Sequence, residues 1–357
     1  MIDILAFESF DGGSHRQFRE TITRHSKHHW VWVTRPPRAW KWRMAISAIE
    51  LVDQAKEQGC FESPPDLIFV TSLIDAAALR AALPRGFRDI PIVLYMHENQ
   101  VSYPSRDVRD ASFACMNLQS ILTSDYVIFN SHWNRDSFTS GIVELLSHSP
   151  DHTLDDVDQR IHDRSTVAWV PVELPPADLR VLHNTACVGD SPIRIVWPHR
   201  WEHDKGPDEL LSIARDHSES LNLRWIILGE QFREIPEAMK TFETEFVDRI
   251  DHVGFVESKT EYWKWLGKAD WVLSTARHEF FGVAVVESLF AGCLPWLPDR
   301  LSYTELLPEV ARGLTPMTAP QDSDSIRGSI TEHLFMAVAN NAVDRIDQIL
   351  ANCLVNL

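Results

Sequence analysis

At 357 residues, the chain is longer than one hydrophobic core usually supports, so its length predicts two domains of ordinary size. Its 44% hydrophobic and 24% charged residues are typical of a globular protein and exclude a fibrous or disordered chain. The net charge of −17 excludes nucleic-acid binding over the whole surface, because phosphate contacts require a local excess of Lys and Arg.

No segment of the sequence indicates secretion or a membrane partner. The longest apolar run, residues 280–297, is interrupted by Glu287 and Gly292. The N-terminus has the pattern of a strand and a turn, and it lacks the basic segment that opens a signal peptide. The five cysteines are scattered and contain no Cys-x-x-Cys pair, which disfavours a zinc site or a disulfide framework. We therefore expect a cytoplasmic protein.

Short β-rich segments alternate with amphipathic segments of helix length in the first half of the chain. Among the helical patterns are residues 44–58 and 113–122. The expected strands are residues 2–7, 30–34, 67–70, 92–96, 126–130 and 167–170. This alternation is typical of βαβ units and predicts an α/β fold with a parallel, doubly wound sheet.

The alternation pauses at residues 172–192, where Pro and small or polar residues predict a linker, and then resumes. The expected strands of the second half are residues 193–197, 224–228, 250–253, 271–274 and 293–297, and a helical segment near 325–353 closes the chain. We therefore predict two Rossmann-like domains, residues 1–178 and 179–357. In open α/β sheets, ligands bind outside the carboxyl ends of the strands, so polar residues there are candidate site residues.

Two candidate segments follow strands of the first domain. Gly12 and Gly13 follow the first strand, where glycines permit a tight turn and a helix N-terminus can receive an anion, although a plain turn explains them equally well. The segment is not Gly-x-Gly-x-x-Gly, which disfavours a dinucleotide cofactor. His97, Glu98 and Asn99 follow the fourth strand, where an imidazole can hydrogen-bond a reacting sugar or leaving group. The alternative is a histidine that braces the loop.

Two cations open the second domain. Arg200 and Lys205 lie five residues apart in a predicted loop between a strand and a helix. Such a pair suits a diphosphate whose charge grows as its glycosidic bond breaks. The alternative is that both are surface cations that pair with Glu202 and Asp204. Their place after a strand favours the ligand-binding interpretation.

The most informative motif is a Glu-x7-Glu segment at the end of a strand and the start of a helix. Glu279, in the loop, can accept hydrogen bonds from sugar hydroxyls, and Glu287, expected two turns into the helix, can reach a ribose. Between them, Phe281, Gly282 and Val283 mark the helix start, whose free N–H groups can meet diphosphate oxygens. The alternative for Glu287 is a buried acid with a partner, because an unpaired buried charge is costly.

One basic segment departs from the acidic balance of the chain. Between residues 14 and 43 lie eight Lys or Arg residues against a single acid. Basic side chains interleaved with aromatic ones can hold phosphates and stack bases. The alternative is a solvated helix face followed by a Trp-rich packing loop. The nucleic-acid candidates of this segment are Arg35, Arg38, Trp40, Lys41, Trp42 and Arg43.

Together these residues resemble the retaining GT-B glycosyltransferases of the family 4 type. In that group an Arg/Lys pair holds the donor diphosphate and a Glu-x7-Glu motif binds sugar and ribose. Arg200 and Lys205 match the pair. Glu279 and Glu287 match the motif, and His97 resembles a histidine near the transferred sugar. The resemblance implies a GT-B fold, in which two Rossmann-like domains with parallel sheets face a central cleft.

Five longer segments resemble the tRNA-queuosine mannosyltransferase family, also known as the glycosyltransferase-like domain-containing protein 1 group. They are AFESFDGGSHRQF at the start, PRAWKWRMA at 37–45, YMHENQVSYP at 95–104, FNSHWNRDSF at 129–138 and PHRWEHDKGP at 198–207. This resemblance implies retaining transfer of mannose from GDP-mannose to the cyclopentenediol of queuosine in the anticodon loop of tRNA-Asp. It implies no cofactor and no metal, because the two cations and backbone N–H groups serve the diphosphate.

The resemblance assigns expected roles to the candidate residues. The expected catalytic residues are His97, Glu279, Arg200 and Lys205. The expected donor-binding residues are Gly12, Gly13, Arg200, Lys205, Phe281, Gly282, Val283 and Glu287. The expected acceptor or tRNA-binding residues are Ser14, His15, Arg35, Arg38, Trp40, Lys41, Trp42, Arg43, Glu98 and Asn99.

Three alternative functions stay open on the sequence alone. One is a family 4 enzyme that uses another nucleotide sugar and a glycan, lipid or small-molecule acceptor; no membrane-docking helix favours the lipid. Another is a non-catalytic RNA-binding protein on the same scaffold. This alternative is disfavoured by the joint presence of five candidates, His97, Arg200, Lys205, Glu279 and Glu287. The third is a nucleotide-sugar epimerase or a phosphorylase-like enzyme.

Overall fold

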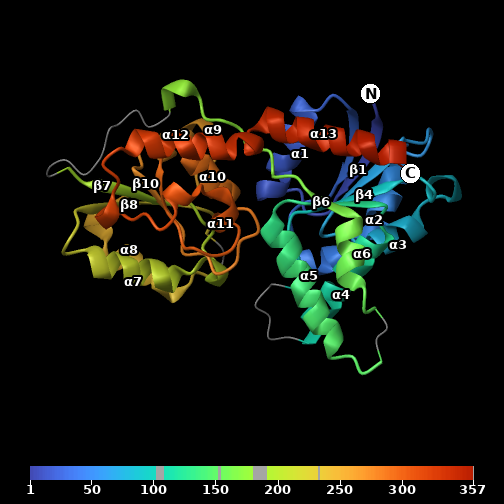
Figure 1. The fold of residues 1–357 in the computed structure, drawn as a ribbon, viewed down its shortest axis with the longest axis horizontal. Helices are drawn as coiled ribbons and strands as arrows, with labels where there is room; N and C mark the ends of the chain where they lie inside the picture. The colour runs from blue at the N-terminus through green and yellow to red at the C-terminus, as the bar shows by residue number, and fades with distance from the viewer. Residues whose placement is uncertain (102–107, 152–153, 180–190, 232–233, 357) are drawn as a thin grey trace. The chain divides into compact units, whose positions relative to one another are not determined.

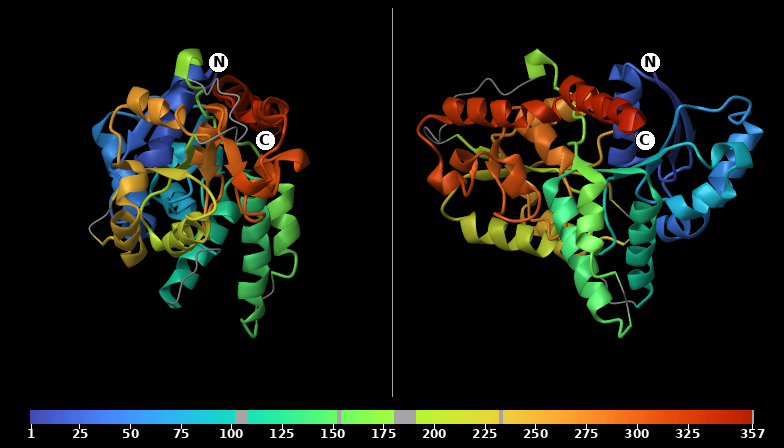
Figure 2. Two further views of the ribbon diagram at one scale, coloured as in Figure 1. Left: turned by 90° about the vertical axis from the view of Figure 1, so that its left-hand side faces the viewer. Right: turned by 45° about the vertical axis from the view of Figure 1, so that its right-hand side comes forward.

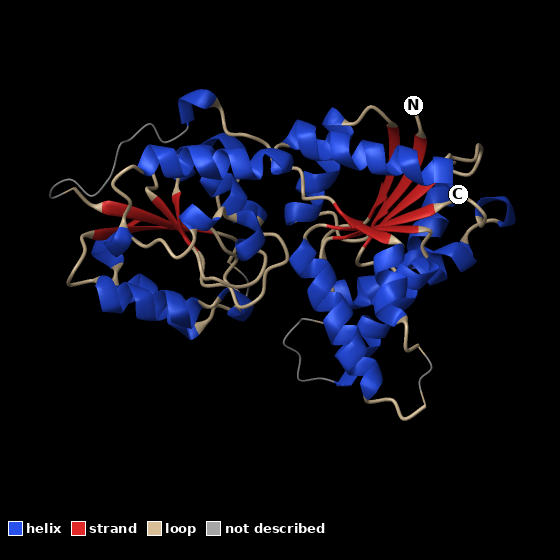
Figure 3. Cartoon of the chain, in the orientation of Figure 1, coloured by secondary structure: helices blue, strands red, loops and turns tan. Residues whose placement is uncertain are grey.

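The computed structural model describes residues 1–101, 108–151, 154–179, 191–231 and 234–356, and their strands form two parallel sheets (Figures 1 and 3). The chain divides into two compact units. Unit 1 comprises Met1–Pro171 and Ala339–Leu357, and unit 2 comprises Val172–Val338. None of the helices in the described ranges is long and apolar enough to cross a membrane.

The sheet of unit 1 has the strand order β2-β1-β3-β4-β5-β6, and all its neighbouring strands are parallel. Its strands are β1 (Asp3–Glu8), β2 (His29–Thr34), β3 (Leu67–Thr71), β4 (Ile92–Met96), β5 (Tyr126–Phe129) and β6 (Ser165–Val167). The strands β3 and β4 are hydrophobic along almost their whole length because helices cover both faces of a parallel sheet. Five of the six predicted strands are confirmed to within one residue at each end, but the strand predicted at residues 167–170 shares only Val167 with β6.

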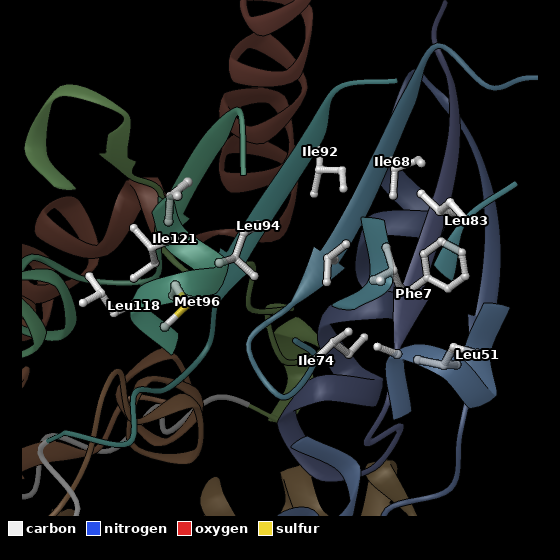
Figure 4. Packing of buried hydrophobic residues seen from close by; sticks show 14 of the residues in the cluster. Phe7, Leu51, Ile68, Ile74, Leu83, Ile92, Leu94, Met96, Leu118 and Ile121 are labelled. Carbon is white, nitrogen blue, oxygen red and sulfur yellow. The ribbon is translucent and has the colours of Figure 1, made fainter. Parts of the chain in front are cut away.

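Helices pack on this sheet, and an apolar core lies between the helices and the strands. The helices are α1 (Gly13–His25), α2 (Trp40–Glu57), α3 (Ala76–Ala82), α4 (Val108–Thr123), α5 (His132–Ser147), α6 (Val157–Asp163) and α13 (Ala339–Asn356). Helices α4, α5 and α6 pack side by side (Figure 2). Figure 4 shows how Phe7 and Ile92 from the strands and Leu118 from α4 belong to one buried cluster. This core fixes the strand ends on which the site is built.

Helix α13 brings the end of the chain back to unit 1, where it packs along α1 (Figure 1). The carboxylate of Asp347 accepts hydrogen bonds from Ser26 Oγ at 2.7 Å and from the backbone N–H of Lys27 at 2.8 Å. The observed division therefore differs from the predicted domains 1–178 and 179–357. The first unit ends at residue 171, and it includes the last helix because its apolar face and Asp347 find their partners there.

Unit 2 is a second parallel sheet with the order β11-β10-β7-β8-β9. Its strands are β7 (Ile193–Trp197), β8 (Leu223–Leu228), β9 (Ile250–Gly254), β10 (Trp271–Leu273) and β11 (Leu294–Trp296). Its helices are α7 (Pro207–His217), α8 (Glu237–Glu245), α9 (Lys259–Leu266), α10 (Val283–Phe290), α11 (Tyr303–Leu306) and α12 (Ser323–His333). The predicted closing helix is thus two helices, α12 and α13. A 3-10 turn and an extended Val338 separate them.

The remaining helical segments are single 3-10 turns. They are Arg85–Phe87, Ala177–Leu179, His203–Lys205, Val247–Arg249, Glu309–Ala311, Pro316–Thr318 and Leu334–Ala337.

Each sheet has a point where the strand order reverses. In unit 1 the chain passes from β1 to β2 on one side and then to β3 on the other, so the reversal lies between β1 and β3. In unit 2 it lies between β7 and β10. Loops diverge at such points and leave room for a ligand at the carboxyl ends of the strands. A ligand is therefore expected at the loops after β1, β7 and β10.

Candidate active site

Lys205 lies at the reversal point of unit 2, in the loop that follows β7. Its Nζ donates a hydrogen bond to the carbonyl oxygen of His278 at 2.9 Å. The same Nζ is 3.4 Å from Glu279 Oε2 and 3.2 Å from Asp204 Oδ2. Only 10% of the Lys205 side chain is exposed. The loops after β7 and β10 thus bring together a buried ammonium and two carboxylates, as the strand order requires.

The charges of this cluster support one another. Burial alone would lower the pKa of Lys205, but Glu279 and Asp204 outweigh it and the pKa is raised. Burial alone would raise the pKa of Glu279, but Lys205 and neighbouring histidines outweigh it and the pKa is lowered. Both groups are therefore ionised near neutral pH. A fixed, partly desolvated cation of this kind can stabilise negative charge that develops on a phosphate leaving group.

Two buried histidines beside Lys205 are neutral near physiological pH. Burial, followed by the charge of Lys205, lowers the pKa of His199 to about 3 and that of His278 to about 4. His199 Nε2 lies 2.9 Å from Ser274 Oγ, which in turn lies 2.7 Å from the hydroxyl of Tyr303. Neither histidine nor Tyr303 was singled out as a site residue on the sequence, although Ser274 was the last residue of the predicted strand 271–274 and directly follows the observed β10.

Arg200 is more exposed than Lys205. About half of its side chain, 47%, is accessible, and its guanidinium is 3.0 Å from Glu202. Both cations therefore have the acidic neighbours that the alternative interpretation named. Lys205 differs from a surface cation because it is buried and also reaches Glu279 from another strand. Arg200 keeps an exposed guanidinium beside this buried pair, and its charge acts on the pKa of Lys205.

Glu287 lies on α10, whose N-cap is Gly282 with a φ of 89°. It is the fifth residue of the helix, little more than one turn from its start and closer than predicted. The carboxylate is buried and forms an ion pair with Lys259 and a hydrogen bond with Tyr262, both on α9. Glu287 is thus a buried acid with partners, as the alternative interpretation proposed. Binding of a ribose there stays a prediction.

The residues at the start of α10 offer mainly backbone groups. The side chain of Phe281 is buried, and its carbonyl oxygen accepts a hydrogen bond from Ser302 at 3.1 Å. Val283 is the first helical residue and is half-buried. A ligand could therefore be reached here through the N–H groups of the first turn.

In unit 1, three polar side chains meet at the carboxyl ends of β1 and β4. Glu8 ends β1, His97 follows β4, and His15 lies in the first turn of α1. His15 Nδ1 is 3.0 Å from Glu8 Oε2, and the rings of His15 and His97 lie 4.2 Å apart. All three residues are buried. Among the residues that the structure describes, they form the one group of His, Cys and acidic side chains whose ligand atoms, all within 4.8 Å, could hold a metal ion.

His97 has largely aromatic surroundings. Its ring lies 4.6 Å from that of Phe18 and 4.7 Å from that of Tyr95. Burial, followed by the nearby His15, holds the pKa of His97 well below its ordinary value. Its Nε2 is buried and has no hydrogen-bond partner among the described residues. The imidazole is therefore neutral, and ring packing fixes its orientation.

The other residues predicted in these loops divide into exposed and bracing residues. Gly13 and Ser14 are exposed at the start of α1, and Gly12 packs close to Pro37. Glu98 is half-buried and accepts a hydrogen bond from the Gln100 amide at 3.1 Å.

Asn99 is fully buried. Its amide nitrogen donates to Asn134 Oδ1 at 2.8 Å, and its side-chain oxygen accepts from the N–H of Val101 at 3.2 Å. These bonds give Asn99 a bracing role between the loop that follows β4 and the first turn of α5.

The predicted basic segment around the start of α2 is partly engaged within unit 1. Arg35 and Arg43 both pair with Glu50, at 3.1 and 3.2 Å. Trp40 packs on the ring of Phe113 at 5.6 Å.

The rest of this segment faces solvent. Arg38 and Lys41 are exposed, and Lys41 Nζ lies 5.3 Å from the centre of the Trp40 ring. Trp42 is 68% exposed. Arg38, Lys41 and Trp42 are therefore the members of the segment that a nucleic acid could reach.

Comparison with known proteins decides the family. Residues 3–172 match the model of the tRNA-queuosine alpha-mannosyltransferase N-terminal family. A tRNA-queuosine alpha-mannosyltransferase of Drosophila melanogaster is 32% identical over 314 residues, which cover 86% of this chain and 82% of that protein. The chain belongs to the tRNA-queuosine alpha-mannosyltransferase family. In this member of the family, the family model covers almost the whole N-terminal part of unit 1.

Solved structures show that this family member has the GT-B fold. Anabaena HepE, solved in complex with UDP and glucose, is similar at a TM-score of 0.62 with 16% identity, over 99% of this chain and 100% of that one. A UDP-forming α,α-trehalose-phosphate synthase from Burkholderia xenovorans gives a TM-score of 0.65 with 12% identity, over 100% and 99% of the two chains. The predicted fold class is thereby confirmed.

Proposed function

We propose that the chain is a retaining glycosyltransferase that transfers mannose from GDP-mannose to the cyclopentenediol of queuosine in the anticodon loop of tRNA-Asp. The observation that carries the proposal is the 32% identity with the Drosophila tRNA-queuosine alpha-mannosyltransferase across most of both chains. The buried Lys205–Glu279 pair at the reversal point of unit 2 supports it, because nucleotide-sugar chemistry needs a fixed cation at the leaving phosphate.

Retention follows from the configurations of donor and product. The mannosyl group of GDP-mannose is attached through an α bond, and the relative is named an alpha-mannosyltransferase. An α donor that gives an α product keeps the configuration of the anomeric carbon. In the proposed step, the bond between C1 and the phosphate oxygen breaks and a bond from C1 to a queuosine hydroxyl oxygen forms. The hydroxyl proton passes to the departing phosphate.

Different residues of unit 2 bind the diphosphate, the sugar and the ribose of the donor. Lys205, with Arg200 beside it, stabilises the charge that develops on the diphosphate, and the N–H groups that follow Gly282 add to it. Glu279 orients the sugar hydroxyls, and Glu287 binds the ribose. No metal and no cofactor enters the proposal, since these cations and N–H groups supply the positive charge.

The residues of unit 1 serve the sugar and the acceptor. His97 contacts the transferred sugar, as the family resemblance implies. Arg38, Lys41 and Trp42 face the tRNA, because they are the exposed members of the basic segment. Arg35 and Arg43 form ion pairs with Glu50 and so support this surface without contacting the tRNA themselves.

The test is transfer of radiolabel from GDP-mannose to tRNA, with queuosine-containing and queuosine-free tRNA side by side. We expect label in the queuosine-containing tRNA alone, and sensitivity of the released nucleoside to an α-mannosidase. Label from a UDP-sugar but not from GDP-mannose would overturn the donor. Absence of label with every nucleotide sugar, from a protein with a cooperative melting transition, would overturn the tRNA acceptor.

A further inference from the structure

The Glu8–His15–His97 cluster lies at the reversal point of the unit 1 sheet. Glu8 ends β1, one of the two strands that flank the reversal, and β3 separates it from β4, which His97 follows. His15 spans this distance from α1, with its Nδ1 on Glu8 and its ring on His97. The cluster therefore connects the loop after the first strand to the histidine that the proposed function places beside the sugar.

The two histidines are held in different ways. Glu8 is fixed from two sides, because its Oε1 accepts the backbone N–H of Phe10 at 2.7 Å and its Oε2 lies 3.0 Å from His15 Nδ1. A carboxylate at Nδ1 sets the proton on that nitrogen and fixes the plane of the ring. His97 has no such bond at its buried Nε2, and its ring is held by neighbouring rings. His15 therefore contacts both the Glu8 carboxylate and the ring of His97.

The rings of His15 and His97 are in close contact. They are tilted by 35° to each other, and their centres lie 4.2 Å apart. The contact geometry suits one ring that supports another.

We propose that Glu8 and His15 are positioning residues, in which Glu8 fixes the His15 ring and that ring holds the His97 imidazole in one orientation toward the transferred sugar. The inference rests on the proposed function for the role of His97. Its structural part, the dependence of His97 on His15 and Glu8, concerns the folded chain alone. The charged and titratable groups around His97 are Glu8 on β1, His15 on α1 and Tyr95 on β4.

The test uses two substitutions in the full chain with a matched control. His15→Asn keeps a side-chain N–H that can donate to Glu8 but removes the ring that faces His97. Glu8→Gln keeps the ring and removes the charge that fixes it. His25→Asn makes the same change at the other end of α1 and serves as the control. Each protein is examined by the nitrogen NMR signals of the His97 ring, assigned with His97→Gln, and by kcat and KM for GDP-mannose.

The NMR signals report the positioning directly. In the wild-type chain and in His25→Asn we expect His97 as one neutral tautomer between pH 8 and about 6. In His15→Asn we expect averaged signals from two tautomers, and in Glu8→Gln a smaller change of the same kind. Identical His97 signals in the wild-type chain and in His15→Asn would overturn the proposal.

Kinetics separate this proposal from the proposed function. We expect kcat to fall about 10- to 100-fold in His15→Asn while KM for GDP-mannose changes little, because a misplaced group affects the reacting geometry more than donor binding. An unchanged kcat would overturn the role of His15 in the reaction. If the wild-type chain transferred no mannose, the proposed function would fail, and the NMR comparison would still decide whether His15 positions His97.

Discussion

At the residue scale, Lys205 shows how a buried charge is balanced by its neighbours. An ammonium group taken out of water must be matched, and Glu279 and Asp204 match it at 3.4 and 3.2 Å. Substitution Lys205→Met keeps the length of the side chain and removes its charge. We expect kcat to fall about 100- to 1,000-fold, as when one donor to a developing negative charge is lost. Initial rates of mannose transfer measure the effect.

The same substitution should also affect stability. Two partly buried carboxylates, Asp204 and Glu279, then lose their shared cation, so the free energy of unfolding should fall by about 3–5 kcal/mol. Lys240→Met is the control, because Lys240 pairs with Glu237 at the surface of α8. A Lys205→Met protein that transfers mannose at the rate of the control would show that this ammonium does not act on the leaving group.

The buried histidines beside Lys205 predict how stability depends on pH. His199 and His278 have folded pKa values of about 3 and about 4, below the value near 6.5 in an unfolded chain. As the pH falls below about 6.5, the unfolded chain takes up protons that the folded one cannot, so stability is lost down to about pH 4. Each pH unit in this window removes about 1.4 kcal/mol for each histidine.

Urea unfolding at pH 7 and pH 5 measures this loss. In the variant His278→Gln, the difference between the two pH values should shrink by on the order of 2 kcal/mol. His203→Gln makes the same change at an exposed histidine of the loop after β7 and should leave the difference as it is. Equal pH dependence in both variants would show that His278 is protonated in the folded chain.

At the scale of single elements, the loop that carries Lys205 depends on one glycine. Gly206 has a φ of 67°, and a Cβ there would lie 2.2 Å from the carbonyl oxygen of Thr275. In Gly206→Ala we expect strain from the left-handed backbone, about 1–2 kcal/mol, and a further loss because backbone atoms must move apart. That movement would shift Lys205 away from Glu279, so the melting temperature and kcat should both fall.

Gly313→Ala separates the two contributions. Gly313 has nearly the same φ, 66°, but a Cβ there would meet nothing within 4 Å. It should therefore show the strain of the left-handed backbone alone and keep full activity. Equal losses of melting temperature in the two variants would mean that the approach of Gly206 to Thr275 contributes nothing.

The positions of strands and helices were easier to predict from the sequence than the side-chain contacts between them. Strands of a parallel sheet are hydrophobic runs, so β4 and β7 were predicted to the residue. The terminal strand β6 is short and less buried, and its prediction was shifted. Lys205 and Glu279 were both selected because they follow predicted strands, and these strands are neighbours in the sheet, which brings the two side chains together.

The contacts of Lys259 and Glu8 with candidate site residues were not predicted, for different reasons. Lys259 meets Glu287 from another helix, a contact that no local pattern reports. Glu8 directly followed the predicted strand 2–7 and lay within the segment AFESFDGGSHRQF, but it was given no role, and its partner His15 was assigned to the acceptor instead.

At the scale of the whole molecule, the fold class followed from the alternation of elements, but the course of the chain did not. The sequence of α13 shows an amphipathic helix and does not show which unit covers its apolar face. Its buried residues include Val343, Ile346 and Leu350. A helix of this composition could pack equally well on either sheet. The predicted boundary placed it with the second domain for lack of a long-range signal, and the structure places it in unit 1.

The return of the chain to unit 1 predicts that Asp347 stabilises that unit. Its buried carboxylate accepts hydrogen bonds from Ser26 Oγ and from the N–H of Lys27, so Asp347→Ala leaves both donors without their acceptor. We expect the free energy of unfolding to fall by about 1–3 kcal/mol. Asp344→Ala, three residues earlier on the same helix, removes only an exposed ion pair with Lys27 and should change little. Denaturation of both variants, followed by hydrogen exchange in β1 and α1, would locate the loss. Loss of protection in unit 2 alone would contradict the assignment of α13 to unit 1.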